Sequence, residues 1–163
     1  MFFVGLFELT IDSKSRLSVP YVVRSKLNSE EDGRSYYVLP GYTLGTLVIY
    51  PDRYFERVRG TPPAPEDLST ATYEWRQFEC SQGALLDPDS QGRILIPERL
   101  LKRAGISREV TLIGVQDHLE LWGREAYEAF QARSWSDYPE RRTKAAQELR
   151  ELAATSVAGQ HTE

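Results

Sequence analysis

The chain has 163 residues, of which 40% are hydrophobic and 27% charged, and it carries a net charge of −4. This composition predicts one compact domain or two small ones sharing a core, and no apolar run approaches the ~20 residues of a membrane span. We therefore expect a cytoplasmic globular protein. One cysteine and two histidines exclude a disulfide framework and a typical zinc site, so no metal or cofactor is expected.

The N-terminal part predicts a module of short strands and helices. Residues 7–11 and 16–19 alternate apolar and polar side chains around a turn at 12–15, which is typical of a hairpin. Pro20 suits the start of a short helix. Two β-rich runs and another helix are predicted further along, at residues 36–39, 46–50 and 51–58.

The C-terminal part repeats this order after a stiff Pro-rich linker and an amphipathic helix at 66–79. A turn, strand, helix, two strands and helix are predicted at residues 89–92, 93–96, 98–104, 110–115, 119–122 and 124–132. A last helix is expected at 139–154, with disorder after it. The predicted divisions are a first module (1–59), a linker and connecting helix (60–81), a second module (82–134), and a C-terminal helix and disordered tail (135–163).

One nine-residue pattern occurs twice, at the turn of each module. It reads Asp12-Ser-Lys-Ser-Arg16-Leu-Ser-Val-Pro20 and Asp89-Ser-Gln-Gly-Arg93-Ile-Leu-Ile-Pro97. The surrounding segments are locally basic, although the chain is acidic overall. A repeat of this kind indicates two copies of one supersecondary unit.

The repeated residues suit contact with DNA. An Asp carboxylate can accept backbone N–H groups and pin the turn, while an Arg guanidinium can grip phosphate or read guanine bidentately. The predicted DNA contacts are Ser13, Lys14, Ser15, Arg16, Arg24, Gln91 and Arg93, with Asp12 and Asp89 orienting the arginines. The alternative is that each Asp–Arg pair only bridges its own hairpin, and the two roles can coexist.

These motifs resemble those of the MraZ family, which carries two D-x-x-x-R motifs. The N-terminal Phe-x-Gly, Leu47-x-Ile-Tyr50-Pro51, Ile113-Gly114-Val115 and Leu119-Glu120-Leu121-Trp122 resemble the same family at the same relative places. The similarity extends over residues 1–135. The doubled motif at this spacing is a specific sign of the family, whereas a single D-x-x-x-R motif would be no evidence for it.

The resemblance implies an α+β fold of tandem AbrB/SpoVT-like swapped-hairpin modules, forming a small barrel-like core with flanking short helices. It implies ring-shaped homo-oligomers that bind double-stranded DNA at repeated operator boxes. Members regulate the division and cell-wall gene cluster, including their own promoter, so we expect a repressor associated with the nucleoid. Ser15 departs from the family, which has Gly there. It fits if the turn needs no positive φ; otherwise the first loop is shifted.

The first turn, around Arg16, is expected to be the main DNA reader. The alternative function is a swapped-hairpin oligomer that acts through protein contacts, as an antitoxin-like or scaffold component, and exposed apolar surface on the last helix would favour it. A hydrolase ranks third, because the sequence has no nucleophile elbow or phosphate-cradling glycine loop. We expect neither catalysis nor a small-molecule substrate. Cys80 is interpreted as a buried hydrophobe, and His118 as structural or exposed without a partner.

Overall fold

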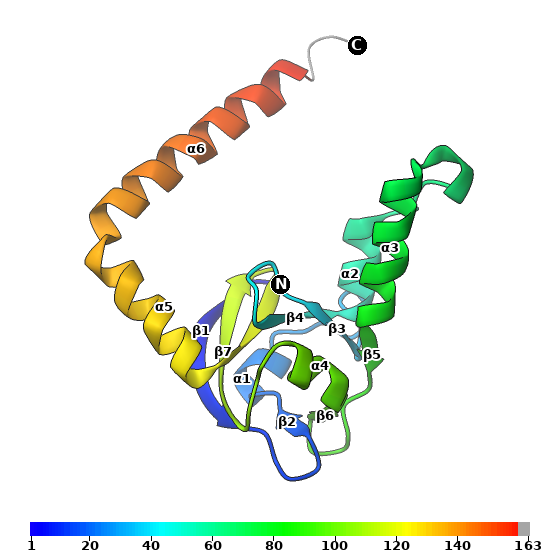
Figure 1. Cartoon of the computed structure of the whole chain (residues 1–163), viewed down its shortest axis with the longest axis vertical. Coiled ribbons are helices and arrows are strands. Elements are labelled where there is room, and N and C mark those ends of the chain that lie inside the picture. The colour runs from blue at the N-terminus through cyan, green and yellow to red at the C-terminus, as the bar shows by residue number, and fades with distance from the viewer. Residues whose placement is uncertain (160–163) are drawn as a thin grey trace. The chain divides into compact units, whose positions relative to one another are not determined.

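The computed structural model describes residues 1–159, with side chains through residue 154. The chain forms two compact units, Met1–Arg124 and Glu125–Glu163. The first unit holds both copies of the repeat and the strands of the described chain. The described part of the second unit is helical (Figure 1).

The mixed content of strands and helices confirms the predicted α+β class. The first module comprises β1 (Phe3–Thr10), β2 (Arg16–Ser18), α1 (Tyr21–Arg24), β3 (Tyr36–Pro40), β4 (Thr46–Pro51) and α2 (Asp52–Arg59). A 3-10 turn η1 (Pro65–Asp67) and helix α3 (Thr70–Gln82) follow. The second module comprises β5 (Ala84–Leu86), β6 (Arg93–Leu95), α4 (Glu98–Arg103), β7 (Glu109–Gln116) and β8 (His118–Gly123). The last helices are α5 (Arg124–Ser136) and α6 (Tyr138–Gly159).

The strands form two antiparallel sheets. One has six strands in the order β1-β7-β8-β4-β3-β5, and the other consists of β2 and β6 alone. β1 and β5 are the two edges of the larger sheet and do not pair with each other. Among the described residues the sheet is therefore open, and the expectation of a barrel-like core is not met.

The predicted hairpin around the first turn is wrong in its strand pairing. β1 pairs with β7, and β2 pairs with β6, so each strand finds its partner in the other module. The turn itself stays closed, because the Asp12 N–H donates to the Arg16 carbonyl at 3.0 Å. Alternating polarity defines a strand's faces but not its neighbour, which is why the sequence pattern did not reveal the exchange.

The pairing of strands across the two modules follows an approximate twofold axis that relates one module to the other. In the β2–β6 ladder, Arg16 lies opposite Leu95, Ser18 opposite Arg93, and Leu17 opposite Ile94. Leu17 and Ile94 occupy equivalent places in the repeat, so the axis passes between them. The β4–β8 ladder shows the same exchange of equivalent positions around Val48 and Glu120. The two charged turns are thus brought to one side of the unit (Figure 1).

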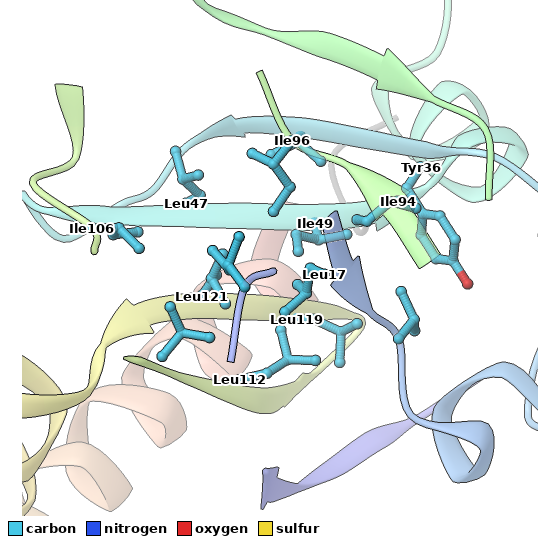
Figure 2. Close-up of a cluster of buried hydrophobic side chains, with 14 of the residues drawn as sticks. Leu17, Tyr36, Leu47, Ile49, Ile94, Ile96, Ile106, Leu112, Leu119 and Leu121 are labelled. Atoms are coloured by element: carbon cyan, nitrogen blue, oxygen red, sulfur yellow. The ribbon is translucent and has the colours of Figure 1, made fainter. Parts of the chain in front are cut away.

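The core lies between the two sheets. Leu17 and Ile94, both fully buried, point inward from the small ladder toward Ile49 and Leu119 of the larger sheet (Figure 2). Burying a side chain of this size stabilises the fold by about 1.5–3 kcal/mol. The small ladder therefore has one face fixed by the core and its other face outward.

The connecting helix and the last helix differ from the predictions. Residues 66–79 do not form one helix, because α3 begins only after Ser69, whose hydroxyl accepts the Thr72 N–H at 3.2 Å. Trp75 of α3 is 61% exposed, and Cys80 is exposed rather than buried. Helix α6 continues to Gly159, so the prediction of disorder does not hold for residues 155–159. Residues 160–163 lie outside the described chain.

Candidate nucleic-acid interface

The first charged turn is organised by the Asp12 carboxylate. Its Oδ1 accepts the backbone N–H groups of Lys14 at 2.9 Å and of Arg16 at 3.0 Å. Its Oδ2 accepts Nε of the Arg16 side chain at 2.7 Å and lies 2.7 Å from Nη2. One carboxylate therefore holds both the loop and the guanidinium that the loop presents.

The second turn has the same hydrogen bonds. Asp89 Oδ1 accepts the N–H groups of Gln91 at 2.9 Å and of Arg93 at 3.0 Å. Asp89 Oδ2 accepts Nε of Arg93 at 2.8 Å and lies 2.6 Å from Nη2. The local Asp–Arg bridge considered from the sequence is thus present in both copies, and in each copy Nε and Nη2 of the arginine meet the same carboxylate oxygen.

The bridges keep both carboxylates ionised. Hydrogen bonds from the backbone and side chain of Arg16 lower the pKa of Asp12. Side-chain and backbone hydrogen bonds from Arg93 lower the pKa of Asp89 to about 2. Each motif is therefore an ion pair at neutral pH, and it adds no net charge to the surface.

The bridge leaves part of each guanidinium available. Asp12 occupies the edge of Arg16 formed by Nε and Nη2, and Asp89 occupies the same edge of Arg93. The Nη1 end carries further donors, and a guanidinium has no acceptor atoms. Each side chain is about one-third exposed or slightly less, at 30% for Arg16 and 27% for Arg93. A second acceptor, such as guanine or phosphate oxygen, can therefore bind beside the carboxylate.

Ser15 adopts the backbone conformation that the family's glycine would favour. Its φ is 58°, against 75° for Gly92 in the second turn. The Ser15 N–H donates to the Asp12 carbonyl at 3.0 Å, just as the Gly92 N–H donates to the Asp89 carbonyl at 2.8 Å. The turn does require positive φ, yet the first loop keeps the same hydrogen bonds, so the expected shift of that loop is absent.

Backbone hydrogen bonds hold the two turns side by side. The Ile96 N–H donates to the Ser15 carbonyl at 3.0 Å, and the Val19 N–H donates to the Gly92 carbonyl at 3.1 Å. These bonds extend the β2–β6 ladder into both loops. The arginines of the two motifs are consequently carried by neighbouring strands of one rigid element.

The remaining predicted contacts divide into two groups. Ser13, Lys14 and Gln91 lie exposed at the tips, where they are free to meet a ligand. Arg24 is half-buried, and its Nε donates to the Val19 carbonyl at 3.0 Å. Arg24 therefore stabilises the fold at this position. Ser15, like Arg24, is only partly exposed.

His118 has partners that sequence reasoning missed. It is 7% exposed, and its Nδ1 lies 2.7 Å from Asp117 Oδ1. Its Nε2 lies 3.5 Å from Glu120 Oε1, within ion-pair range but long for a hydrogen bond. The ring stacks on Tyr50 with centroids 4.8 Å apart. Burial opposes the charged form, but Glu120 and Asp117 outweigh it and raise the pKa of His118.

The part of the chain that the structure describes offers no candidate for a metal site or for a membrane-spanning helix. No group of three or more His, Cys, Asp or Glu side chains is placed to hold a metal ion. In the same residues, no helix is both long enough and apolar enough to span a bilayer.

A family model and several named relatives, all of the same family, match this chain. A family model described as "MraZ protein, putative antitoxin-like" matches residues 82–150, which include the second turn. Proteins named "Transcriptional regulator MraZ" from Burkholderia cenocepacia (strain HI2424) and Burkholderia orbicola (strain MC0-3) are each 34% identical to it over 127 residues. The protein of that name from Burkholderia mallei (strain SAVP1) has the same identity. Each match covers 78% of this chain and 86% of the relative.

These relatives, which agree with the repeated charged turn, place the chain among transcriptional regulators. The comparisons also confirm the resemblance seen in the sequence. The chain belongs to the MraZ family.

Proposed function

We propose that this regulator binds double-stranded DNA through the paired Asp–Arg turns. The observation that carries the proposal is the matching Asp–Arg bridge in both turns, which fixes Arg16 and Arg93 on one ladder. Preorganised arginines lose little conformational entropy when they bind, and their Nη1 groups, which the bridges do not use, suit guanine or phosphate. The exposed Ser13, Lys14 and Gln91 add polar groups for the backbone of the duplex.

The approximate twofold relation between the turns also supports this proposal. A DNA duplex has local twofold symmetry, so two related arginines can approach its two strands in the same way. In this interpretation the halves are tandem AbrB/SpoVT-like swapped-hairpin modules, 1–59 and 82–134, joined by residues 60–81 and followed by 135–163. The pairing of β1 with β7 and of β2 with β6, each across the two modules, supports the interpretation.

Each module offers few contacts, so the proposal includes a homo-oligomer. A ring of identical chains would line up the turns on repeated operator boxes and gain affinity through multivalency. By family resemblance, the target is the division and cell-wall gene cluster, including the chain's own promoter, and the outcome is repression. The protein would act in the cytoplasm, at the nucleoid.

Titration of DNA with single-arginine variants tests this proposal. The probe is the duplex immediately upstream of the gene for this chain. Arg16→Ala is expected to weaken binding by about 1–3 kcal/mol, with steep loss of affinity as salt rises. Arg34→Ala is the matched control, because Arg34 is exposed and lies outside both turns. Equal affinities for both variants and the wild type would remove Arg16 from the binding surface.

The second candidate function is an oligomer that acts through protein contacts. Leu149 and Leu152 of α6 are 66% and 67% exposed, and they lie on one stripe of the helix. Light scattering with and without the promoter duplex separates the two functions. A stable oligomer that ignores DNA at low salt would favour the second candidate.

A further inference from the structure

One apolar side chain stands on the outer face of the charged ladder. Leu95 is 58% exposed, whereas its neighbours Ile94 and Ile96 are fully buried. Successive residues of a strand point to opposite faces, so the inward orientation of Ile94 places Leu95 outward. Leu95 therefore contributes little to the core, and its side chain is accessible from outside.

The register places Leu95 beside an arginine of the motif. Leu95 lies directly opposite Arg16 in the β2–β6 ladder. Residues opposite each other in an antiparallel pair point to the same face, with Cβ atoms about 4.5–5.5 Å apart. The outer face thus joins a charged donor group and an exposed apolar group, both fixed by strands.

The equivalent place in the other half of the ladder is polar. Ser18 lies opposite Arg93, and Ser18 and Leu95 correspond in the two copies of the repeat. The two arginines are held by the same hydrogen bonds, so their own geometry does not distinguish the halves. Their neighbours do, because one arginine has an isobutyl group beside it and the other a hydroxyl.

We propose that Leu95 is a specificity-determining residue that contacts the C5-methyl group of thymine next to the base read by Arg16. This inference rests on the proposed DNA-binding function. The thymine methyl is the apolar group displayed in the major groove, and it is what distinguishes thymine from uracil. Successive bases are about 3.4 Å apart, so a residue one cross-strand step from Arg16 reaches an adjacent base pair. Arg93 lies beside Ser18, whose hydroxyl group offers no such apolar contact, so the base next to the one read by Arg93 need not be thymine.

Removing single methyl groups from the DNA tests the contact. The probe is the duplex upstream of this chain's gene. Footprinting first identifies the segment that the protein protects, and each thymine of that segment is then replaced in turn by deoxyuridine. For the wild type, one such replacement is expected to weaken binding about fourfold, the effect of losing one buried methyl group. Leu95→Ser should bind the thymine and uracil duplexes equally. Ser18→Leu is the matched gain-of-function variant, and it should create a second sensitive thymine.

The outcomes separate this inference from the function beneath it. If Arg16→Ala weakens binding but no thymine-to-uracil change affects the wild type, Leu95 is not a methyl reader and the proposed function stands. A sensitive thymine that stays sensitive in Leu95→Ser also overturns the assignment. If the wild type binds this duplex no better than unrelated DNA, both the function and the assignment fail. Unchanged thermal unfolding of both variants would show that their folds are intact.

Discussion

The guanidinium of Arg24 lies against Gly92, although the two residues belong to different modules. A Cβ atom at Gly92 would be 2.5 Å from both Cζ and Nε of Arg24. That Nε also donates to the Val19 carbonyl, so the side chain is held in place. Arg24, predicted as a DNA contact, therefore also fastens helix α1 to the second charged turn.

The first prediction follows from this contact and from the positive φ of Gly92. Gly92→Ser should lower the free energy of unfolding by about 1–2 kcal/mol, the usual cost of a left-handed non-glycine residue. Displacing Arg24 from its hydrogen bond adds to this loss. Urea unfolding monitored by tryptophan fluorescence measures the change.

Ser15→Gly is the matched control in the first turn. Ser15 already has a φ of 58°, so glycine should relieve strain and raise stability by up to about 1 kcal/mol. Changes of opposite sign at the two equivalent positions would confirm that both turns require this conformation. A Gly92→Ser variant as stable as the wild type would contradict it.

The charged turns could be predicted from the sequence because their hydrogen bonds are local. Asp12 and Arg16 are four residues apart, and the bonds that join them need no distant partner. The strand pairing could not be predicted in the same way. Whether β2 pairs with β1 or β6 depends on how the two modules pack, and the alternation of side chains is the same in either case.

The orientation of Leu95 and the contacts of His118 differ in how far the sequence could have predicted them. In the apolar run Ile94-Leu95-Ile96, composition does not show which residue faces out; the burial of Ile94 and Ile96 and the exposure of Leu95 do. His118 and Glu120 alternate on one strand face, a spacing that could have indicated their contact. The stacking of His118 on Tyr50 depends on the β4–β8 pairing and had no local signal.

The second prediction concerns the core beneath the turns. Leu17→Ala should destabilise the protein by about 2–5 kcal/mol, because Leu17 is fully buried opposite Ile94 and the cavity cannot be hydrated favourably. Leu95→Ala, on the outer face of the same ladder, should change stability by less than about 0.5 kcal/mol. Chemical denaturation of both variants compares the two faces directly. Equal losses would mean that the ladder does not have one buried and one open face.

The third prediction concerns the ionisation of the motif. Asp89 should titrate near pH 2, because its pKa is lowered by the side-chain and backbone hydrogen bonds of Arg93. A lowered pKa contributes stability that is present above the ordinary value of 3.8 and is lost as pH falls through the folded value. Carbon-13 NMR of the side-chain carboxyl groups measures the titration. Arg93→Ala should return Asp89 toward 3.8, and an unchanged pKa in that variant would show that the bridge is absent in solution.

The fourth prediction concerns His118. Its pKa is raised above 6.5, since Glu120 and Asp117 favour the charged ring more than burial opposes it. The stability that it contributes should be fully present below pH 6.5 and lost as pH rises through the folded pKa. Urea unfolding of wild type and His118→Gln between pH 5.5 and 8.5 should show their difference shrinking with increasing pH. Glu120→Gln should move that decline to lower pH, because it removes one of the two carboxylates. A difference that grew with pH would instead mean that the buried ring is neutral.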